Sequence, residues 1–325
     1  MKRFLCVMFV VLLAFGMLGC AKKQAQSAGE KKLKVGLMLY SAVDEATITI
    51  RNGVIKAAEE YGVELTIGEN GGDATKTAAL LQSMFTQQVD AIIDVTWDDS
   101  VGVTTSQLCK EKGIPLVTCD VAYDDYAVLV GPNNYGSGRT NGEYSAKWIK
   151  DNWGGEIDLI LGMYPYFTGP AIKARIDGCL DVFKEQGILP AESKIIWQDN
   201  IGATDQSRKI TTDFLTANPN ARKIFIITNN DAGALGAYNA VLAMNREKDC
   251  MIMSFNADSY ALEHFATTAD SAWKGTVNFN LAQYGSLAMP VIFKILESGR
   301  NSVENVYNTQ TFVIDRANVK DYYKP

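Results

Sequence analysis

The residues best able to do chemistry in this chain are polar and aromatic side chains that directly follow short apolar segments. They are Ser41, Asp44, Trp97, Asp98, Asp99, Asp120, the segment 164–167, Lys173, residues 229–231, Asn256, Asp258 and residues 278–280. In open α/β sheets, ligands bind outside the carboxyl ends of the strands. Carboxylates, amides and aromatic rings combine donors and acceptors with flat apolar faces, which suits a small polyhydroxylated molecule.

Several of these residues also have a purely structural explanation. Asp44, Asp98 and Asp231 precede helical patterns, where a carboxylate commonly caps the helix N-terminus. The aromatic residues at 164–167 could pack within a loop rather than line a cleft. Lys173 lies early in an apolar helix, where a solvated lysine is common.

Motifs for enzyme chemistry are missing from the sequence. The single histidine, His264, is expected on the exposed face of a short helix. There is no GxSxG nucleophile motif, no GxxxxGK[ST] phosphate loop and no CxxC or Cys/His cluster for zinc. The glycines at 136, 138 and 142 have the wrong spacing for a dinucleotide loop and indicate a plain helix start. We therefore predict a non-catalytic protein without metal or cofactor.

The elements that position these residues follow a regular rhythm of apolar segments and helical patterns. Ten strands are expected, at 33–39, 63–67, 91–95, 116–119, 127–130, 158–163, 195–197, 224–227, 251–255 and 273–277. Continuous apolar runs such as 224–227 suit strands buried on both faces, as in parallel sheets. Alternating strands and helices predict doubly wound α/β sheets with right-handed crossovers. Ten strands exceed one compact open sheet of this length, so we expect two lobes of five or six strands each.

The first 19 residues have the composition of an export signal. Lys2 and Arg3 precede an apolar run at 4–18, which is shorter than the about 20 residues of a membrane-spanning helix. The sequence Met17-Leu18-Gly19-Cys20 resembles the lipobox of bacterial lipoproteins, which implies acylation of Cys20. Residues 20–32 are polar and predict a flexible tether of about 20 Å. An ordinary signal followed by an unrelated cysteine is the alternative.

The net charge and the cysteine content further restrict the class of protein. Removing residues 1–19 removes two cations, so the net charge of −6 becomes −8, which excludes coating of nucleic acid or of an anionic membrane. Four cysteines remain beyond Cys6 and Cys20, namely Cys109, Cys119, Cys179 and Cys250. Their spacing matches no disulfide framework, so buried free thiols are expected. Cys109 and Cys119 are the one pair worth checking for a bridge.

Four segments together resemble the periplasmic sugar-binding proteins of the ribose-binding type, which are substrate receptors of bacterial ABC importers. They are GIPLVTCD at 113–120, GPNNYGSG at 131–138, FIITNNDAGALGA at 225–237 and the pair Phe255-Asn256. The resemblance runs from about residue 34 to 313. It implies two α/β lobes joined by a three-strand hinge, with chain crossings near Asn134, Asn280 and Asn308. The lobes would be 33–134 with 280–308, and 135–279 with 309–325.

The resemblance also implies ligand contacts. The residues that match family contacts, together with Trp97 as a stacking face, are Asp44, Trp97, Asp120, Lys173, Asn230, Asn256 and Phe279. Lys173 stands where the family usually has arginine, Asn256 where it has aspartate and Phe279 where it often has glutamine. The family's aromatic pair after the first strand is replaced by Ala46-Thr47, so Trp97 or the segment 164–167 would have to supply the stacking face.

The sequence thus predicts an exported, lipid-anchored receptor in the cell envelope. It would act as a monomer, bind a monosaccharide or polyol, and deliver it to the membrane permease of an ABC transporter. A sensory receptor for the same ligands and a secreted α/β enzyme with an unrecognised site are the alternatives. A transcription regulator of related fold is excluded because a signal stands where its DNA-binding domain would lie.

Overall fold

The computed structural model describes residues 32–324, so the predicted signal peptide and the lipidation at Cys20 lie outside the described residues. Within them the chain forms two six-stranded sheets. The first has the order β11-β5-β4-β3-β1-β2, and all of its strand pairs are parallel. Its strands are β1 (Lys34–Leu39), β2 (Glu64–Glu69), β3 (Ala91–Val95), β4 (Leu116–Cys119), β5 (Val128–Gly131) and β11 (Val306–Asn308).

The second sheet has the order β12-β10-β9-β8-β6-β7. Its strands are β6 (Leu159–Tyr164), β7 (Ile195–Asp199), β8 (Ile224–Thr228), β9 (Cys250–Asn256), β10 (Trp273–Asn278) and β12 (Phe312–Asp315). Every pair is parallel except β12 with β10, which is antiparallel. The predicted parallel two-lobed fold is confirmed, but the two short strands β11 and β12 were missed.

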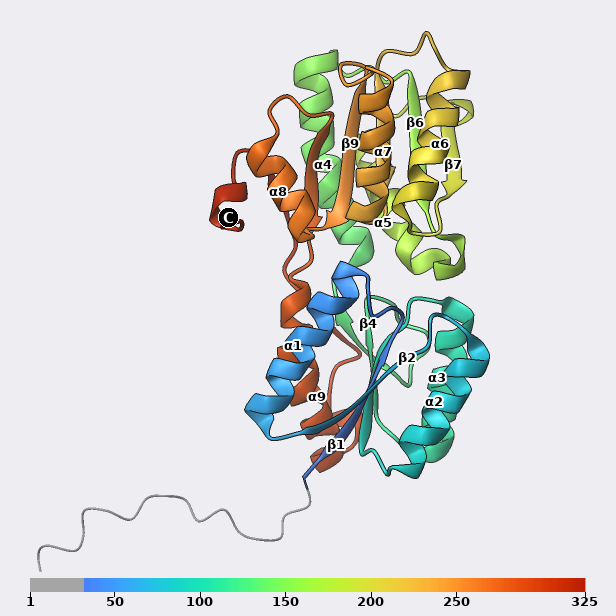
Figure 1. Cartoon of the computed structure of the whole chain (residues 1–325), viewed down its shortest axis with the longest axis vertical. Coiled ribbons are helices and arrows are strands. Elements are labelled where there is room, and N and C mark those ends of the chain that lie inside the picture. Colours follow the sequence, from blue (N-terminus) through green and yellow to red (C-terminus); the bar gives the residue numbers. More distant parts are fainter. Residues whose placement is uncertain (1–31, 325) are drawn as a thin grey trace, which may run out of the picture. The chain divides into compact units, whose positions relative to one another are not determined.

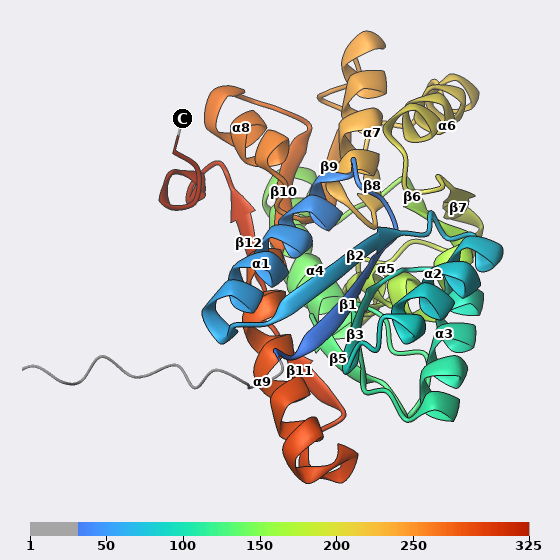
Figure 2. The same ribbon diagram turned by 60° about the horizontal axis from the view of Figure 1, so that its bottom comes forward.

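Helices cover both faces of each sheet (Figures 1 and 2). Around the first sheet lie α1 (Glu45–Tyr61) and α9 (Tyr284–Ser298) on one face and α2 (Ala74–Thr86) and α3 (Asp99–Lys112) on the other. Around the second lie α4 (Asn134–Trp153) and α5 (Gly169–Glu185) on one face and α6 (Thr204–Ala217), α7 (Asp231–Ala243) and α8 (Ser259–Thr267) on the other. We call these two assemblies the first lobe and the second lobe.

The chain passes between the lobes three times, after β5, after β10 and after β11. Asn134 is the first residue of α4, Asn280 follows β10 and Asn308 ends β11, so the predicted crossings lie in or next to these connections. Buried side chains run continuously through this region, where Phe279 and Tyr284 belong to the same apolar cluster as Val117 and Ile227. The exact residues at which one lobe becomes the other stay a prediction.

The structure tests the predictions for the four cysteines and for His264. The four cysteines among the described residues are free and buried, as predicted. The prediction for His264 was wrong, because its ring is half-buried, stacks on Trp273 and lies 2.6 Å from the Ser271 hydroxyl through Nε2. Burial lowers the pKa of His264 to about 4, so the ring is neutral at pH 7.

Candidate functional site

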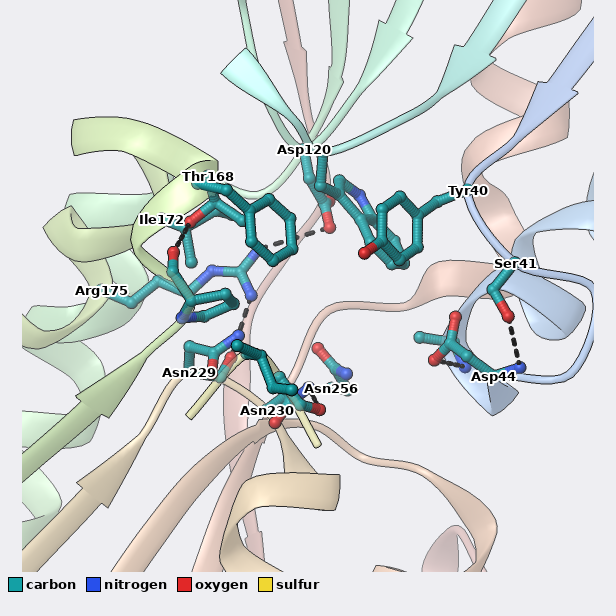
Figure 3. Close-up of a pocket in the computed structure, with 16 residues that line it drawn as sticks. Tyr40, Ser41, Asp44, Asp120, Thr168, Ile172, Arg175, Asn229, Asn230 and Asn256 are labelled. Carbon is teal, nitrogen blue, oxygen red and sulfur yellow. Dashed lines mark hydrogen bonds and ion pairs between the residues drawn. The ribbon is translucent and has the colours of Figure 1, made fainter. Parts of the chain in front are cut away.

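A cavity of about 150 Å³ lies at the carboxyl ends of the strands of both lobes (Figure 3). From the first lobe it is lined by Tyr40, Ser41, Asp44, Ala46, Trp97 and Asp120. From the second lobe it is lined by Pro165, Phe167, Thr168, Ile172, Arg175, Ile201, Gly202, Asn229, Asn230 and Asn256. An engineered protein cavity of similar volume binds benzene, so this cavity has the size for a solute with a single ring.

Five of the seven predicted ligand residues line this cavity, namely Asp44, Trp97, Asp120, Asn230 and Asn256. They come from four strand ends and one helix start that are far apart in the sequence. Parallel strands bring their carboxyl ends to one edge of a sheet, and the two sheets present these edges to the same cavity. Lys173 and Phe279 do not line it.

Asp120 is the most constrained of these residues. It follows β4 with a left-handed φ of 68°, which only a minority of non-glycine residues adopt. Its carboxylate accepts hydrogen bonds from Arg175 Nη2 at 3.3 Å and from the Tyr284 hydroxyl at 2.5 Å. Burial raises the pKa of Asp120, although Arg175 and Tyr284 oppose that change. The Asp120 carboxylate therefore accepts hydrogen bonds within the protein and also lines the cavity.

Arg175 lines the cavity but was not predicted from the sequence. It lies on α5 of the second lobe, is 3% exposed, and makes three hydrogen bonds, of which the one to Asp120 reaches the first lobe. Nε donates to Asn134 Oδ1 at 2.8 Å, Nη1 to the Asn229 carbonyl at 3.0 Å, and Nη2 to Asp120. Burial lowers the pKa of Arg175, but a guanidinium in a protein stays protonated. A buried cation paired with a buried anion thus spans the base of the cavity.

We expected Lys173 at the position where the family usually has arginine. The cation that lines the cavity is instead Arg175, on the opposite face of α5. Two residues rotate a helix by about 200°, so Lys173 and Arg175 point to opposite faces. Lys173 pairs with Asp177 and lies 4.6 Å from the centre of the Trp197 ring, outside the cavity. A usable signal was present, because Arg175 shares its helix face with the apolar Ile172 and Cys179.

Phe279 supports the cavity from behind. Its side chain is fully buried, and its ring centre lies 4.5 Å from the Arg175 guanidinium carbon. The ring also stacks on Phe255 with centres 5.8 Å apart. Phe279 thus holds Arg175 through a cation–π contact. This contact needs an aromatic ring at the position where the family often has glutamine.

Asp44 and Asn230 cap helices at the edge of the cavity. Asp44 accepts from the backbone amides of Ala46 and Thr47 at the start of α1. Asn230 accepts from the Gly233 amide at the start of α7 and donates to the Gly202 carbonyl at 3.1 Å. Each therefore has a structural role and lines the cavity as well.

Besides Asp44, the sequence indicated Asp98 and Asp231 as possible helix caps. Asp98 caps α3, as expected, by accepting from the Val101 amide at 3.0 Å. Asp231 is not a cap, because Asn230 caps α7 instead. Asp231 is the first residue of α7 and accepts hydrogen bonds from the hydroxyls of Ser254 and Thr276 inside the second lobe.

Asn256 and Asn229 are the amides of the second lobe with unused bonding capacity. Asn256 ends β9 with a positive φ of 113° and has no side-chain hydrogen bond within the part of the chain that the structure describes. Asn229 Oδ1 is buried and has no partner among residues 32–324. These amides follow neighbouring strands, β8 and β9, and provide neutral donors and acceptors.

Aromatic rings form one wall of the cavity. Tyr40, at the end of β1, stacks on Phe167 of the other lobe with ring centres 5.9 Å apart and planes within 11°. Trp97 lies 5.8 Å from Tyr40, centre to centre. Trp97 and Phe167 thus line the cavity, whereas Tyr164 and Tyr166 contact one another outside it. Tyr40 was missed, although it directly follows the first apolar strand.

Glycines bring α4 and α5 close enough to place Arg175. A Cβ on Gly138 would lie 2.2 Å from the Arg175 carbonyl oxygen, and one on Gly178 would lie 2.2 Å from the Tyr135 carbonyl oxygen. These distances are below any real contact, so only glycine fits. The glycines at 136, 138 and 142 all lie in the first half of α4, with Gly136 and Gly138 near its start as predicted. The missing side chains at 138 and 142 serve helix packing.

We predict that Gly138→Ala displaces α5 and destabilises the protein. Overpacking typically costs about 1–3 kcal/mol, more than the helix propensity that alanine adds. Urea denaturation measures the loss. Gly136→Ala is the matched control, because a Cβ there meets mainly the Asn133 side chain at 3.1 Å. Equal stability of the two variants would contradict the prediction.

Comparisons with known proteins agree with this architecture. Residues 35–301 match the family described as periplasmic binding protein domain, and the chain belongs to this family. It is 23% identical over 281 residues to the ribose import binding protein of Bacillus subtilis, covering 84% of this chain and 85% of that protein. It is 26% identical to a putative rhizopine-binding protein of Rhizobium meliloti, covering 67% and 71%.

Solved structures share the fold. A solute-binding protein of an ABC transporter from Actinobacillus succinogenes, with bound D-allose, has a TM-score of 0.76 and 22% identity, covering 90% of this chain and 100% of that one. One from Bacillus halodurans with bound myo-inositol has a TM-score of 0.76 and 19% identity, covering 91% and 99%.

Family membership confirms the predicted class, a periplasmic binding protein rather than an enzyme. The chain is accordingly an exported protein of the cell envelope. Among residues 32–324, no helix combines the length and apolar character that crossing a membrane requires.

Proposed function

We propose that this protein is a lipid-anchored receptor that captures a monosaccharide or polyol and delivers it to the permease of an ABC importer. The observation that carries the proposal is the single-ring cavity between two lobes, which combines an aromatic wall with amide and carboxylate groups. Aromatic rings favour the apolar faces of a sugar ring, and amides and carboxylates bind its hydroxyls.

Specificity in this proposal comes from hydrogen bonding inside a closed cavity. A buried polar group that loses its partner costs about 1–3 kcal/mol, so a solute with a misplaced hydroxyl is rejected. Asp44, Trp97, Asp120, Asn230 and Asn256 are the proposed contacts among the predicted residues, with Arg175 added. Lys173 and Phe279 are proposed to act indirectly, since neither lines the cavity.

A thermal-shift screen tests the proposed ligand class. We expect one or more monosaccharides or polyols to raise the melting temperature, because a ligand at 100 times its Kd adds about 2.7 kcal/mol of stability. Nucleosides and amino acids serve as controls of similar size. No response to any sugar or polyol would refute the assignment, whether or not the control compounds respond.

Cys20 is the proposed point of attachment to the membrane, and the protein is proposed to act there as a monomer. We predict that Cys20→Ser moves the exported protein from the membrane fraction to the soluble fraction, because a serine offers no thiol for acylation. Cys109→Ser is the matched control, since that thiol is buried in the first lobe. Membrane retention of Cys20→Ser would contradict the lipid anchor.

A further inference from the structure

Helix α8 of the second lobe begins without a capping bond from its own N-cap residue. Its N-cap residue, Asp258, makes no side-chain bond to the helix amides. One carboxyl oxygen instead accepts from the Tyr260 hydroxyl at 2.8 Å, and the other is buried without a partner among the described residues. Burial, reinforced by Asp231, raises the pKa of Asp258 well above its usual range, which favours the uncharged form.

The first lobe supplies the missing carboxylate. Glu45 Oε1 accepts a hydrogen bond from the Ser259 amide at 2.5 Å, across 214 residues of sequence. Glu45 lies in the first turn of α1, next to the cavity residues Asp44 and Ala46. A carboxylate at this position satisfies a free amide and interacts favourably with the positive end of the α8 dipole.

Helix α5 also meets the first lobe at the cavity rim, where it continues from the 3-10 helix Tyr166–Thr168 and its Gly169 amide donates to the Tyr166 carbonyl. Its N-cap residue, Thr168, makes no side-chain capping bond. Asp99 of the first lobe lies against the first residue of the helix, because a Cβ on Gly169 would be 3.2 Å from Asp99 Cγ and 3.4 Å from its Oδ2. A second carboxylate of the first lobe thus packs against the first residue of a second helix of the other lobe, near the positive end of its dipole.

Both contacts join elements that carry cavity residues. Glu45 adjoins Asp44, and Asp99 follows Trp97 by two positions, while α5 and α8 begin just after Thr168 and Asn256. The contacts exist only while the lobes are together. Any free energy they contribute therefore favours the closed state over an open one.

We propose that Glu45 and Asp99 are closure residues, which hold the second lobe by the N-termini of α8 and α5 and so raise solute affinity without touching the solute. The solute readout of this inference rests on the proposed function. Affinity falls with the fraction of protein in the binding-competent state, so weaker closure appears as weaker binding. Since charge–helix interactions are screened by ions, the contribution also declines with salt.

The test compares Glu45→Gln, Asp99→Asn and the double variant with wild type, using the solute found in the screen. We expect each single change to weaken binding about threefold to tenfold, mainly through faster dissociation. Raising NaCl from roughly 0.05 to 0.5 M should weaken wild type more than the double variant. Asp205→Asn is the matched control, because Asp205 lies in the first turn of α6, within the second lobe.

Unchanged affinity and an unchanged salt effect in the double variant would overturn the inference while leaving the proposed function intact. If wild type binds no sugar or polyol, the proposed function fails and amide hydrogen exchange decides instead. Faster exchange at residues 169–172 and 259–262 in the double variant, but not in Asp205→Asn, would support the closure contacts. Equal exchange in all three proteins would refute them.

Discussion

Replacing Arg175 by methionine should lower the stability of this protein by about 3–5 kcal/mol, because it leaves a buried carboxylate without its cation. Arg175 is paired with Asp120 at 3.3 Å, and both side chains are at most 5% exposed. The change also removes donors from Asn134 and from the Asn229 carbonyl. Urea denaturation at neutral pH measures the loss, and solute affinity should fall as well since both residues line the cavity.

Two further variants separate the charge effect from a simple loss of packing. Lys173→Met removes a cation from the same helix, but its pair with Asp177 is partly exposed, so a change below about 1 kcal/mol is expected. Combining Arg175→Met with Asp120→Asn removes the unpaired charge and should recover part of the stability. If Arg175→Met proves as stable as Lys173→Met, the ion pair does not hold the lobes.

The second large effect is expected for Asp94→Asn, which should be more stable than wild type at pH 8. Asp94 is the fourth residue of β3 and is fully buried. It is hydrogen-bonded by Thr96, whose amide donates to Oδ1 at 3.0 Å, while its Oδ2 has no partner among residues 32–324. Burial raises the pKa of Asp94 to about 7 from an ordinary value of 3.8. Asparagine keeps the acceptor for Thr96 and removes the charge.

The sign of this pH effect follows from proton binding. Between about pH 4 and 7 the folded protein holds the Asp94 proton more tightly than the unfolded chain, so stability declines as the pH rises through that range. At about 1.4 kcal/mol per pKa unit, the decline from this residue is at most about 4 kcal/mol. Asp94→Asn should therefore match wild type near pH 4 and exceed it at pH 8.

Denaturation at both pH values, with Asp125→Asn as an exposed control, measures the difference. Asp231 contributes a slope of the same sign in every variant, because burial raises its pKa to about 7 as well. The slope of Asp94→Asn is therefore reduced rather than abolished. Equal stability of Asp94→Asn and wild type at pH 8 would show that Asp94 does not titrate as inferred.

The sequence was sufficient for the fold because the strands carry strong local signals. β3 contains the apolar run 91–93 and β8 the apolar run 224–227, and helices α1 and α3 end at the left-handed glycines Gly62 and Gly113. β11 and β12 escaped prediction because three or four residues carry no usable periodicity. Their pairing with β5 and β10 is decided by tertiary contact.

For the candidate site, the polarity of parallel strands predicted that a longer set of polar strand-end residues shares a common edge. The family resemblance selected Asp44, Asp120, Asn230 and Asn256 from that set, with Trp97 as a stacking face, and these five residues line the cavity. Which side chain of α5 faces the cavity depends on the rotation of the helix. A shift of two positions along the helix replaces Arg175 by Lys173 at that face.

Only the tertiary structure decided how the lobes hold one another. Asp120 and Arg175 are 55 residues apart, and Glu45 and Ser259 are 214 apart. No local pattern marks such pairs, because each partner also has an ordinary local explanation. Their distances follow from how the two sheets meet, and that is a property of the whole folded chain rather than of any segment.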